Sequence, residues 1–136
     1  MLRDHKNKIE EIMELNTSMI KRKNIDSNNF TQKNVESLRL NESIDTSYLK
    51  VMYNALETLS KDTLDYIQTL YYVGAEIELN GEKEYSKDEV FQEYLKHVKS
   101  FKEDRNGQIM YLTNKMHLSK FIDKGINYLG WDVDNI

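Results

Sequence analysis

Residues 60–81 read Ser-Lys-Asp-Thr-Leu-Asp-Tyr-Ile-Gln-Thr-Leu-Tyr-Tyr-Val-Gly-Ala-Glu-Ile-Glu-Leu-Asn-Gly, and the interpretation of their second half decides the fold class. Apolar residues at helical spacing predict one continuous buried face. That face consists of Leu64, Ile67, Leu70, Tyr71, Gly74 and Ile77. Ser60 can cap the start of this helix, and Asn80-Gly81 is a typical stop.

A short β-hairpin over residues 76–85 is the alternative, because Asn80-Gly81 favours a tight two-residue turn. The hairpin would pair Glu78 with Lys83, which is favourable. It would also set two apolar residues opposite two glutamates, so it would have no apolar face. A lone two-stranded hairpin is only marginally stable. We therefore favour the helix.

Capping signals predict further helices on both sides of this stretch. Asp45 can cap a helix whose buried face is Leu49, Met52, Tyr53, Leu56 and Leu59. Ser86-Lys87-Asp88-Glu89 is a capping box, with Tyr85 and Val90 as a hydrophobic staple around it. The helix after it would bury Val90, Phe91, Tyr94, Leu95, Val98 and Phe101. We expect it to end near residues 104–107, with Gly107 in the left-handed conformation.

The last segment, residues 108–130, has apolar residues whose spacing slips near His117. It therefore forms either one helix or two helices with a break at that point. Gly130 is a plausible stop, and we expect Trp131 to pack back on the body.

The N-terminal segment, residues 4–23, carries a narrow apolar stripe with a polar residue in its middle. The stripe consists of Ile9, Ile12, Met13, Asn16, Met19 and Ile20. A central asparagine can set the register of a coiled coil, so Ile9, Ile12, Asn16 and Met19 are candidates for the seam of a homodimer. In that case residues 1–23 protrude from the body. We favour a helix that packs on its own domain, because the stripe is shorter than three heptads.

Residues 24–34 are rich in Asn, Asp and Ser, which compete with helical hydrogen bonds, and they are predicted to form a loop. With 136 residues, the chain 1–136 is expected to be a single domain. The fold class is therefore all-α, or mostly α if the hairpin forms. We expect a compact bundle of about five to six helices.

Composition excludes several classes of protein. The chain has no Cys, so disulfide scaffolds and thiolate metal sites are ruled out. No stretch is apolar enough to span a membrane, and the charged N-terminus lacks a signal-peptide core, so we expect a cytoplasmic protein. Abundant Lys, Asn and Ile fit an AT-rich coding genome, such as that of a low-GC bacterium or one of its phages.

Catalytic motifs are missing from the sequence. The three histidines are not spaced as metal ligands, and there is no nucleophile elbow or phosphate-binding loop. No metal or cofactor is therefore expected, although Asp62 and Asp65 share a helix face and could hold a metal. An enzyme with a dispersed site, built on His97 or His117 and two carboxylates, remains an alternative.

Charge is distributed unevenly along the chain, whose net charge is −4. Residues 41–104 contain 7 basic and 14 acidic side chains, between two weakly basic ends. An acidic surface can dock a basic partner or mimic a nucleic acid. We therefore expect a non-enzymatic helical interaction module, a regulator or inhibitor such as a phage anti-defence protein. Its expected partner-binding residues are Glu76, Glu78, Glu82, Glu84 and Tyr85.

A helical subunit of a nucleoprotein complex is the alternative function. Lys21, Arg22 and Lys23 could contact phosphates, with Phe30 stacking nearby, although the acidic chain is not expected to bind nucleic acid autonomously. Residues 66–76 resemble the small helical subunit of type III CRISPR effector complexes. That resemblance implies a helical subunit within a nucleoprotein assembly. It assigns no residue role, because the family's Gly-Arg-Glu step is Gly74-Ala75-Glu76 here.

Overall fold

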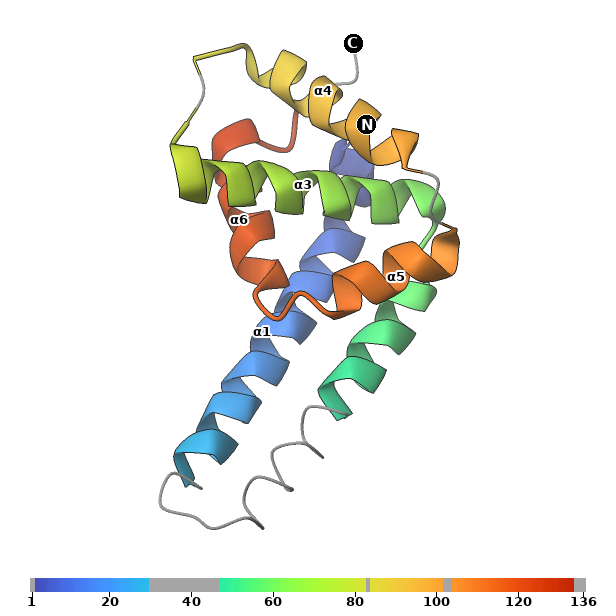
Figure 1. Ribbon diagram of the computed structural model, residues 1–136, viewed down its shortest axis with the longest axis vertical. Helices are drawn as coiled ribbons and strands as arrows, with labels where there is room; N and C mark the ends of the chain where they lie inside the picture. Colours follow the sequence, from blue (N-terminus) through green and yellow to red (C-terminus); the bar gives the residue numbers. More distant parts are fainter. Residues whose placement is uncertain (1, 30–46, 83, 102–103, 134–136) are drawn as a thin grey trace.

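The computed structural model describes residues 2–29, 47–82, 84–101 and 104–133, with the backbone alone described for 21–29 (Figure 1). All the regular elements in these ranges are helical, so the all-α prediction is confirmed. They are a 3-10 turn (Leu2–His5), α1 (Lys6–Asn29), a helix over 47–57, α3 (Lys61–Asn80), α4 (Lys87–Ser100), α5 (Arg105–Thr113) and α6 (Leu118–Leu129).

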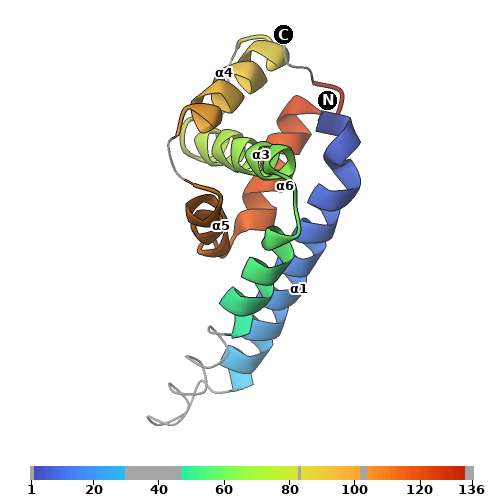
Figure 2. The same cartoon turned by 90° about the vertical axis from the view of Figure 1, so that its right-hand side faces the viewer.

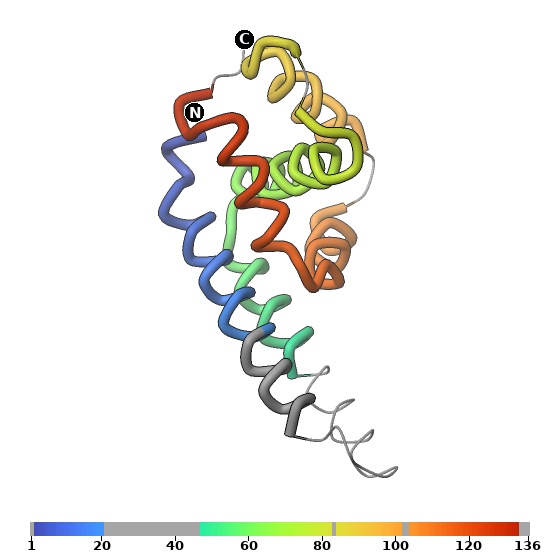
Figure 3. The backbone as a smooth tube through the Cα atoms, turned by 90° about the vertical axis from the view of Figure 1, so that its left-hand side faces the viewer, coloured from blue at the N-terminus to red at the C-terminus, as the bar shows by residue number. Residues whose placement is uncertain are grey.

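Helix α3 lies at the centre of the bundle. In Figure 1 it runs across the molecule, with α4 above it, α5 below it and α6 crossing behind it. Figure 2 views α3 almost along its axis and shows these three helices around it. Figure 3 shows α6 running beside α1 as well. The predicted face of α3 is buried at Leu64, Ile67 and Leu70, which belong to the main hydrophobic core.

Two glycines allow α3 and α6 to cross with their backbones in contact. A Cβ atom on Gly74 would lie 1.8 Å from the carbonyl oxygen of Phe121, which no side chain can tolerate. A Cβ atom on Gly125 of α6 would lie 2.5 Å from the carbonyl oxygen of Leu70 on α3. The position of α6 on α3 therefore depends on the absence of side chains at both sites.

The hairpin alternative is wrong, because residues 76–80 continue α3 and no strand occurs among the described residues. Gly81 ends the helix with φ 78°, and its N–H donates to the carbonyl oxygen of Ile77. The physical reason lies in the apolar face, which continues along the helix to the half-buried Ile77. A hairpin would have lost that face.

The predicted caps of two helices are confirmed. The Ser60 hydroxyl accepts from the Thr63 N–H at 3.2 Å, and the Ser86 hydroxyl accepts from the Glu89 N–H at 3.3 Å. The predicted staple at α4 is not supported, since Tyr85 is 68% exposed whereas Val90 is buried.

The predicted end of α4 is wrong. The helix stops at Ser100, and Phe101 is 42% exposed rather than buried. The cause is Asp104, whose carboxylate accepts from the Gly107 N–H at 2.7 Å and so caps the start of α5. Gly107 consequently lies inside α5 and does not have a positive φ.

The last part of the chain forms two helices with a break between them, which is one of the two predicted alternatives. The break separates α5 from α6. Helix α6 begins after His117 and ends at Gly130, whose φ is 80°. Trp131 is half-buried against the core, and the Lys6 ammonium lies 5.6 Å from its ring centre. The expected return of this tryptophan to the body is confirmed.

The helix over 47–57 is rotated relative to the prediction. Met52, Leu56 and Leu59 are buried as expected, but Leu49 is 39% exposed and Tyr48 is buried in its place. The hydroxyl of Tyr48 meets Asn16 of α1, which fixes this rotation. The predicted cap at Asp45 lies outside the described residues.

Helix α1 is longer than predicted, since it continues to Asn29. The loop prediction is therefore wrong for residues 24–29, and residues 30–34 lie outside the described part of the chain. Asn, Asp and Ser each cost a helix only about half a kcal/mol, so a helix already formed can continue through them.

Candidate functional site

The two most exposed large apolar side chains of the described residues lie within seven residues of each other in the sequence, where α3 ends and α4 begins. Leu79, near the end of α3, is 79% exposed, and Tyr85, just before α4, is 68% exposed. Glu82 and Glu84 lie between them and are exposed. We call these four residues, Leu79, Glu82, Glu84 and Tyr85, the acidic corner; it is at the upper left of Figure 1.

Two of the predicted partner-binding glutamates are engaged within the chain. Glu78 pairs with Lys124 and lies 3.7 Å from Lys120, which ties the end of α3 to α6. The Glu76 carboxylate accepts from the Asn80 side-chain amide at 2.9 Å. Of the four predicted glutamates, this leaves Glu82 and Glu84, which are exposed and form no ion pair with a described residue.

Sequence analysis missed Leu79 as a functional candidate. The signal was available, because Leu79 lies two residues beyond Ile77, about 200° around the helix from the buried face. A leucine at that angle points away from the core. The competing hairpin interpretation treated it as a strand residue and so hid its exposure.

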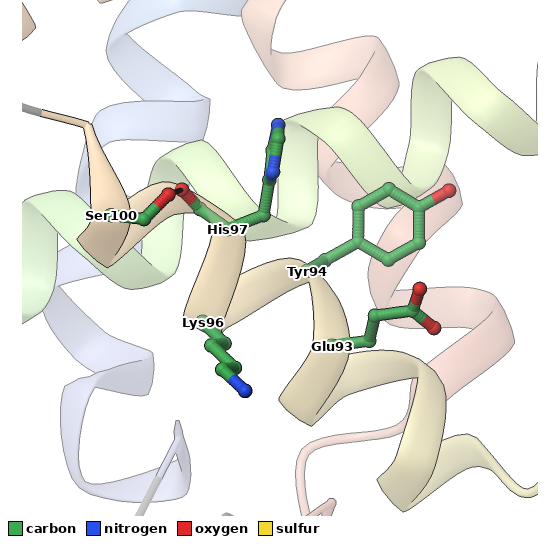
Figure 4. A pocket seen from close by; sticks show the side chains of 5 residues that line it. All are labelled: Glu93, Tyr94, Lys96, His97 and Ser100. Carbon is green, nitrogen blue, oxygen red and sulfur yellow. Dashed lines mark hydrogen bonds between the residues drawn. The ribbon is translucent and has the colours of Figure 1, made fainter.

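A groove on α4 forms a surface hollow of about 430 Å³. Its described lining comes from α4 alone: Glu93, Tyr94, Lys96, His97 and Ser100 (Figure 4). Ser100 donates its hydroxyl proton to the carbonyl oxygen of His97 at 2.6 Å, so it is not directed at the imidazole. The groove is an open surface hollow without a nucleophile–base pair among these residues.

The acidic pair Asp62 and Asp65 does not form a joint site. Asp65 is buried and accepts from the Lys61 ammonium at 2.7 Å and from the Gln108 amide at 2.9 Å. Gln108 also donates to Gln68 at 2.8 Å. This buried network joins α3 to α5. In the part of the chain that the structure describes, no three His, Asp or Glu side chains are grouped as metal ligands.

His117, the other histidine considered for a dispersed catalytic site, does not complete such a site either. His117 is exposed at the start of α6 and makes no side-chain capping bond. His5, by contrast, is partly buried with its Nδ1 atom 2.7 Å from the Thr63 hydroxyl, which is a structural contact between the N-terminus and α3.

The candidate oligomer seam on α1 packs against other residues of the same chain. Ile9 and Ile12 are buried, and Met19 is half-buried against the same core. Asn16 is fully buried, and its amide donates to the Tyr48 hydroxyl at 2.7 Å and to the Met116 carbonyl at 3.2 Å. Its oxygen accepts from the Ser119 N–H at 2.9 Å. The homodimer seam is therefore corrected to an internal contact.

The nucleic-acid candidates cannot be placed. Lys21, Arg22 and Lys23 lie on α1, but their side chains are outside the described set, and Phe30 is outside the described residues. Their role stays a prediction from the sequence.

Tyr48, Tyr71 and Asp132 are among the side chains away from the acidic corner whose pKa values are shifted. Burial raises the pKa of Tyr48, and the hydrogen bond from Asn16 opposes this rise. Burial, followed by the neighbouring Tyr72, raises the pKa of Tyr71. The pKa of Asp132 is lowered by the hydrogen bond that it accepts from Arg3 at 2.6 Å, which joins the two ends of the described chain.

Comparisons with family models, with curated proteins and with solved structures found no match. A search of the described helices found none with the length and apolarity needed to cross a membrane.

Proposed function

We propose that this protein is a non-enzymatic interaction module that binds a basic protein partner through the acidic corner and thereby regulates or inhibits it. The observation that carries the proposal is the exposure of Leu79 (79%) and Tyr85 (68%) beside two exposed glutamates. In this account the two apolar side chains supply most of the affinity, and the carboxylates orient the partner and raise the association rate.

The energetics support such a division of roles. Burying an exposed leucine or tyrosine side chain contributes about 1.5–3 kcal/mol, so two together suffice for the centre of a modest interface. Negative charge beside them attracts a basic surface and raises the association rate more than the final affinity. A complementary partner would offer an apolar pocket surrounded by Lys or Arg.

The two helices on either side of the acidic corner are held in place by the fold. Leu79 is on α3, which is anchored by the close crossing with α6 and by the pair between Glu78 and Lys124. Tyr85 directly precedes Ser86, the cap of α4. A binding surface held in position before contact loses less conformational entropy on association, which favours affinity.

The wider setting of the proposal rests on the sequence. A cytoplasmic regulator or inhibitor, encoded by a low-GC bacterium or a phage, is consistent with the Lys, Asn and Ile content and with the missing catalytic motifs. An anti-defence role is the specific form that we propose.

Photo-crosslinking tests the proposal. A photoreactive phenylalanine analogue at position 85 is expected to crosslink one basic protein in an extract of the producing cell. The same analogue at Asn54, which is exposed on another helix, is the control and is expected to crosslink none. Leu79→Ser should abolish the crosslink from position 85. Equal crosslinking from both positions, or a crosslink that survives Leu79→Ser, would contradict the proposal.

A further inference from the structure

Asparagine is followed by glycine twice in the chain, at Asn80-Gly81 and at Asn106-Gly107. In this dipeptide the backbone nitrogen of the glycine can attack the side-chain carbonyl carbon (Cγ) of the asparagine, because glycine has no side chain to hinder the approach. A bond forms between that nitrogen and Cγ, and the side-chain nitrogen leaves as ammonia with the proton that the glycine nitrogen gives up. Water then opens the resulting succinimide ring to aspartate or isoaspartate, and no oxidant or reductant is involved.

Helical structure holds this reaction back. A helix fixes the backbone dihedrals of the asparagine, and it holds the N–H of the following residue in a hydrogen bond. The nitrogen can reach Cγ only when this part of the backbone opens, so the rate follows the fraction of time for which the segment is locally open. The two dipeptides differ in the contacts that such an opening breaks.

The first dipeptide lies at the end of a helix, where opening is easy. Asn80 is exposed and is the last residue of α3, whose end lies at the edge of the bundle in Figure 1. The Gly81 N–H donates to the carbonyl oxygen of Ile77 at 2.8 Å, and the Asn80 amide donates to the Glu76 carboxylate at 2.9 Å. Nothing lies within 4 Å of the place where a Cβ atom of Gly81 would be. Rotation of the Asn80 backbone therefore breaks these two bonds and meets open space, and helix ends open in this way at low cost.

The second dipeptide lies in the first turn of α5, where three contacts oppose opening. The Gly107 N–H donates to the Asp104 carboxylate at 2.7 Å, and such a charge-assisted bond is stronger than a bond to a carbonyl oxygen. The carboxylate also disfavours the loss of the N–H proton that the attack requires. The side-chain oxygen of Asn106 accepts from the Tyr53 hydroxyl, and the next residue, Gln108, is buried in the network that joins α3 to α5.

We infer that Asn80 is a site of spontaneous deamidation, whereas the fold protects Asn106. Conversion of Asn80 adds a carboxylate directly after Leu79 of the acidic corner. The new charge lies four residues after Glu76 and at the negative end of the α3 dipole, and both repel it. Isoaspartate also lengthens the backbone by one carbon atom, which interrupts a helix. The last turn of α3 therefore loosens in the modified protein, and the surface of the acidic corner changes without an enzyme acting on it.

Peptide mapping by mass spectrometry measures both sites in the same molecule. The full chain is kept in mildly alkaline buffer, and samples taken over time are digested at acidic pH. We expect Asn80 to convert at least about tenfold faster than Asn106 in the folded chain. The rate at Asn80 should rise with pH, because the attacking nitrogen must lose its proton. In concentrated urea the two sites should convert at similar rates, because the fold no longer distinguishes them.

Asp104→Ala is the matched variant, because it removes the carboxylate that holds the Gly107 N–H. We expect the rate at Asn106 to rise at least about threefold, as for the loss of a helix cap, and the rate at Asn80 to stay the same. The unchanged rate at Asn80 and a melting curve show that the variant is folded. Equal rates at the two sites of the folded wild type, or no conversion of Asn80 while the urea-unfolded chain converts, would overturn the inference. None of these measurements uses the partner, so this test is independent of the proposed function.

Discussion

Gly74→Ala is expected to lower the free energy of unfolding by about 3 kcal/mol, the upper range for overpacking a core. The added methyl group would lie 1.8 Å from the Phe121 carbonyl oxygen, which is backbone and cannot rotate away. Helices α3 and α6 would therefore have to separate, and the core between them would lose contacts. Urea unfolding followed by circular dichroism measures the change.

Gly81→Ala is the matched control for this prediction. Gly81 has φ 78°, but nothing lies within 4 Å of the place where its Cβ atom would be. Alanine there meets no other atom, and its cost is the strain of a backbone conformation with φ 78° and ψ 176° that essentially only glycine adopts, about 1–3 kcal/mol. Similar small losses for both variants would show that α3 and α6 do not cross as closely as described. Gly125→Ala should be destabilising too, and its effect should not add fully to that of Gly74→Ala because both act at one crossing.

Asn16→Ala is expected to destabilise the fold by about 3 kcal/mol, because it leaves several buried polar groups without partners. The Tyr48 hydroxyl, the Met116 carbonyl and the Ser119 N–H all lose a hydrogen bond. An unsatisfied buried group costs about 1–3 kcal/mol. Tyr48→Phe removes only the first of these bonds and should cost about 1 kcal/mol, measured in the same urea titration.

The sign of the effect of Asn16→Leu separates the internal role of Asn16 from a coiled-coil role. At a coiled-coil seam, replacing a central asparagine by leucine raises stability and changes the number of helices that associate. In the structure, leucine would bury an apolar group against three polar ones. We expect a loss of stability and no change in oligomeric state; a gain in stability would contradict the internal contact.

Local chemistry made the helix starts predictable. Ser60 and Ser86 cap their helices through bonds to the third residue after them, and this depends on a few neighbouring residues. Stops at Gly81 and Gly130 follow from glycine's access to positive φ, and both are confirmed. The all-α class followed once residues 76–80 were assigned to α3.

Contacts between distant segments were not predictable from periodicity. The rotation of the helix over 47–57 depends on Tyr48 meeting Asn16, which is 32 residues away. The pattern showed Asn16 as an anomaly in an apolar stripe, and two explanations fitted it. The choice between them depends on the Met116 carbonyl and the Ser119 N–H, which no local pattern connects to α1.

The candidate site was predicted in part. Charge counting located the acidic segment, and Glu82, Glu84 and Tyr85 do lie at an exposed corner. The same counting could not show that Glu78 is paired with Lys124, because that pair forms only when α3 and α6 cross. It also gave no weight to Leu79, whose exposure follows from its angle on the completed helix.

The affinity of the crosslinked partner for charge-reversed variants tests the central claim most directly. Isothermal titration calorimetry would measure binding by two double variants. One carries Glu82→Lys and Glu84→Lys at the acidic corner, and the other carries Glu10→Lys and Glu14→Lys on α1. Both pairs are exposed carboxylates, and both double variants change the net charge equally. We predict that the acidic-corner variant weakens binding about a hundredfold, and the α1 variant less than about threefold. Equal losses in the two variants would contradict a docking site at the acidic corner.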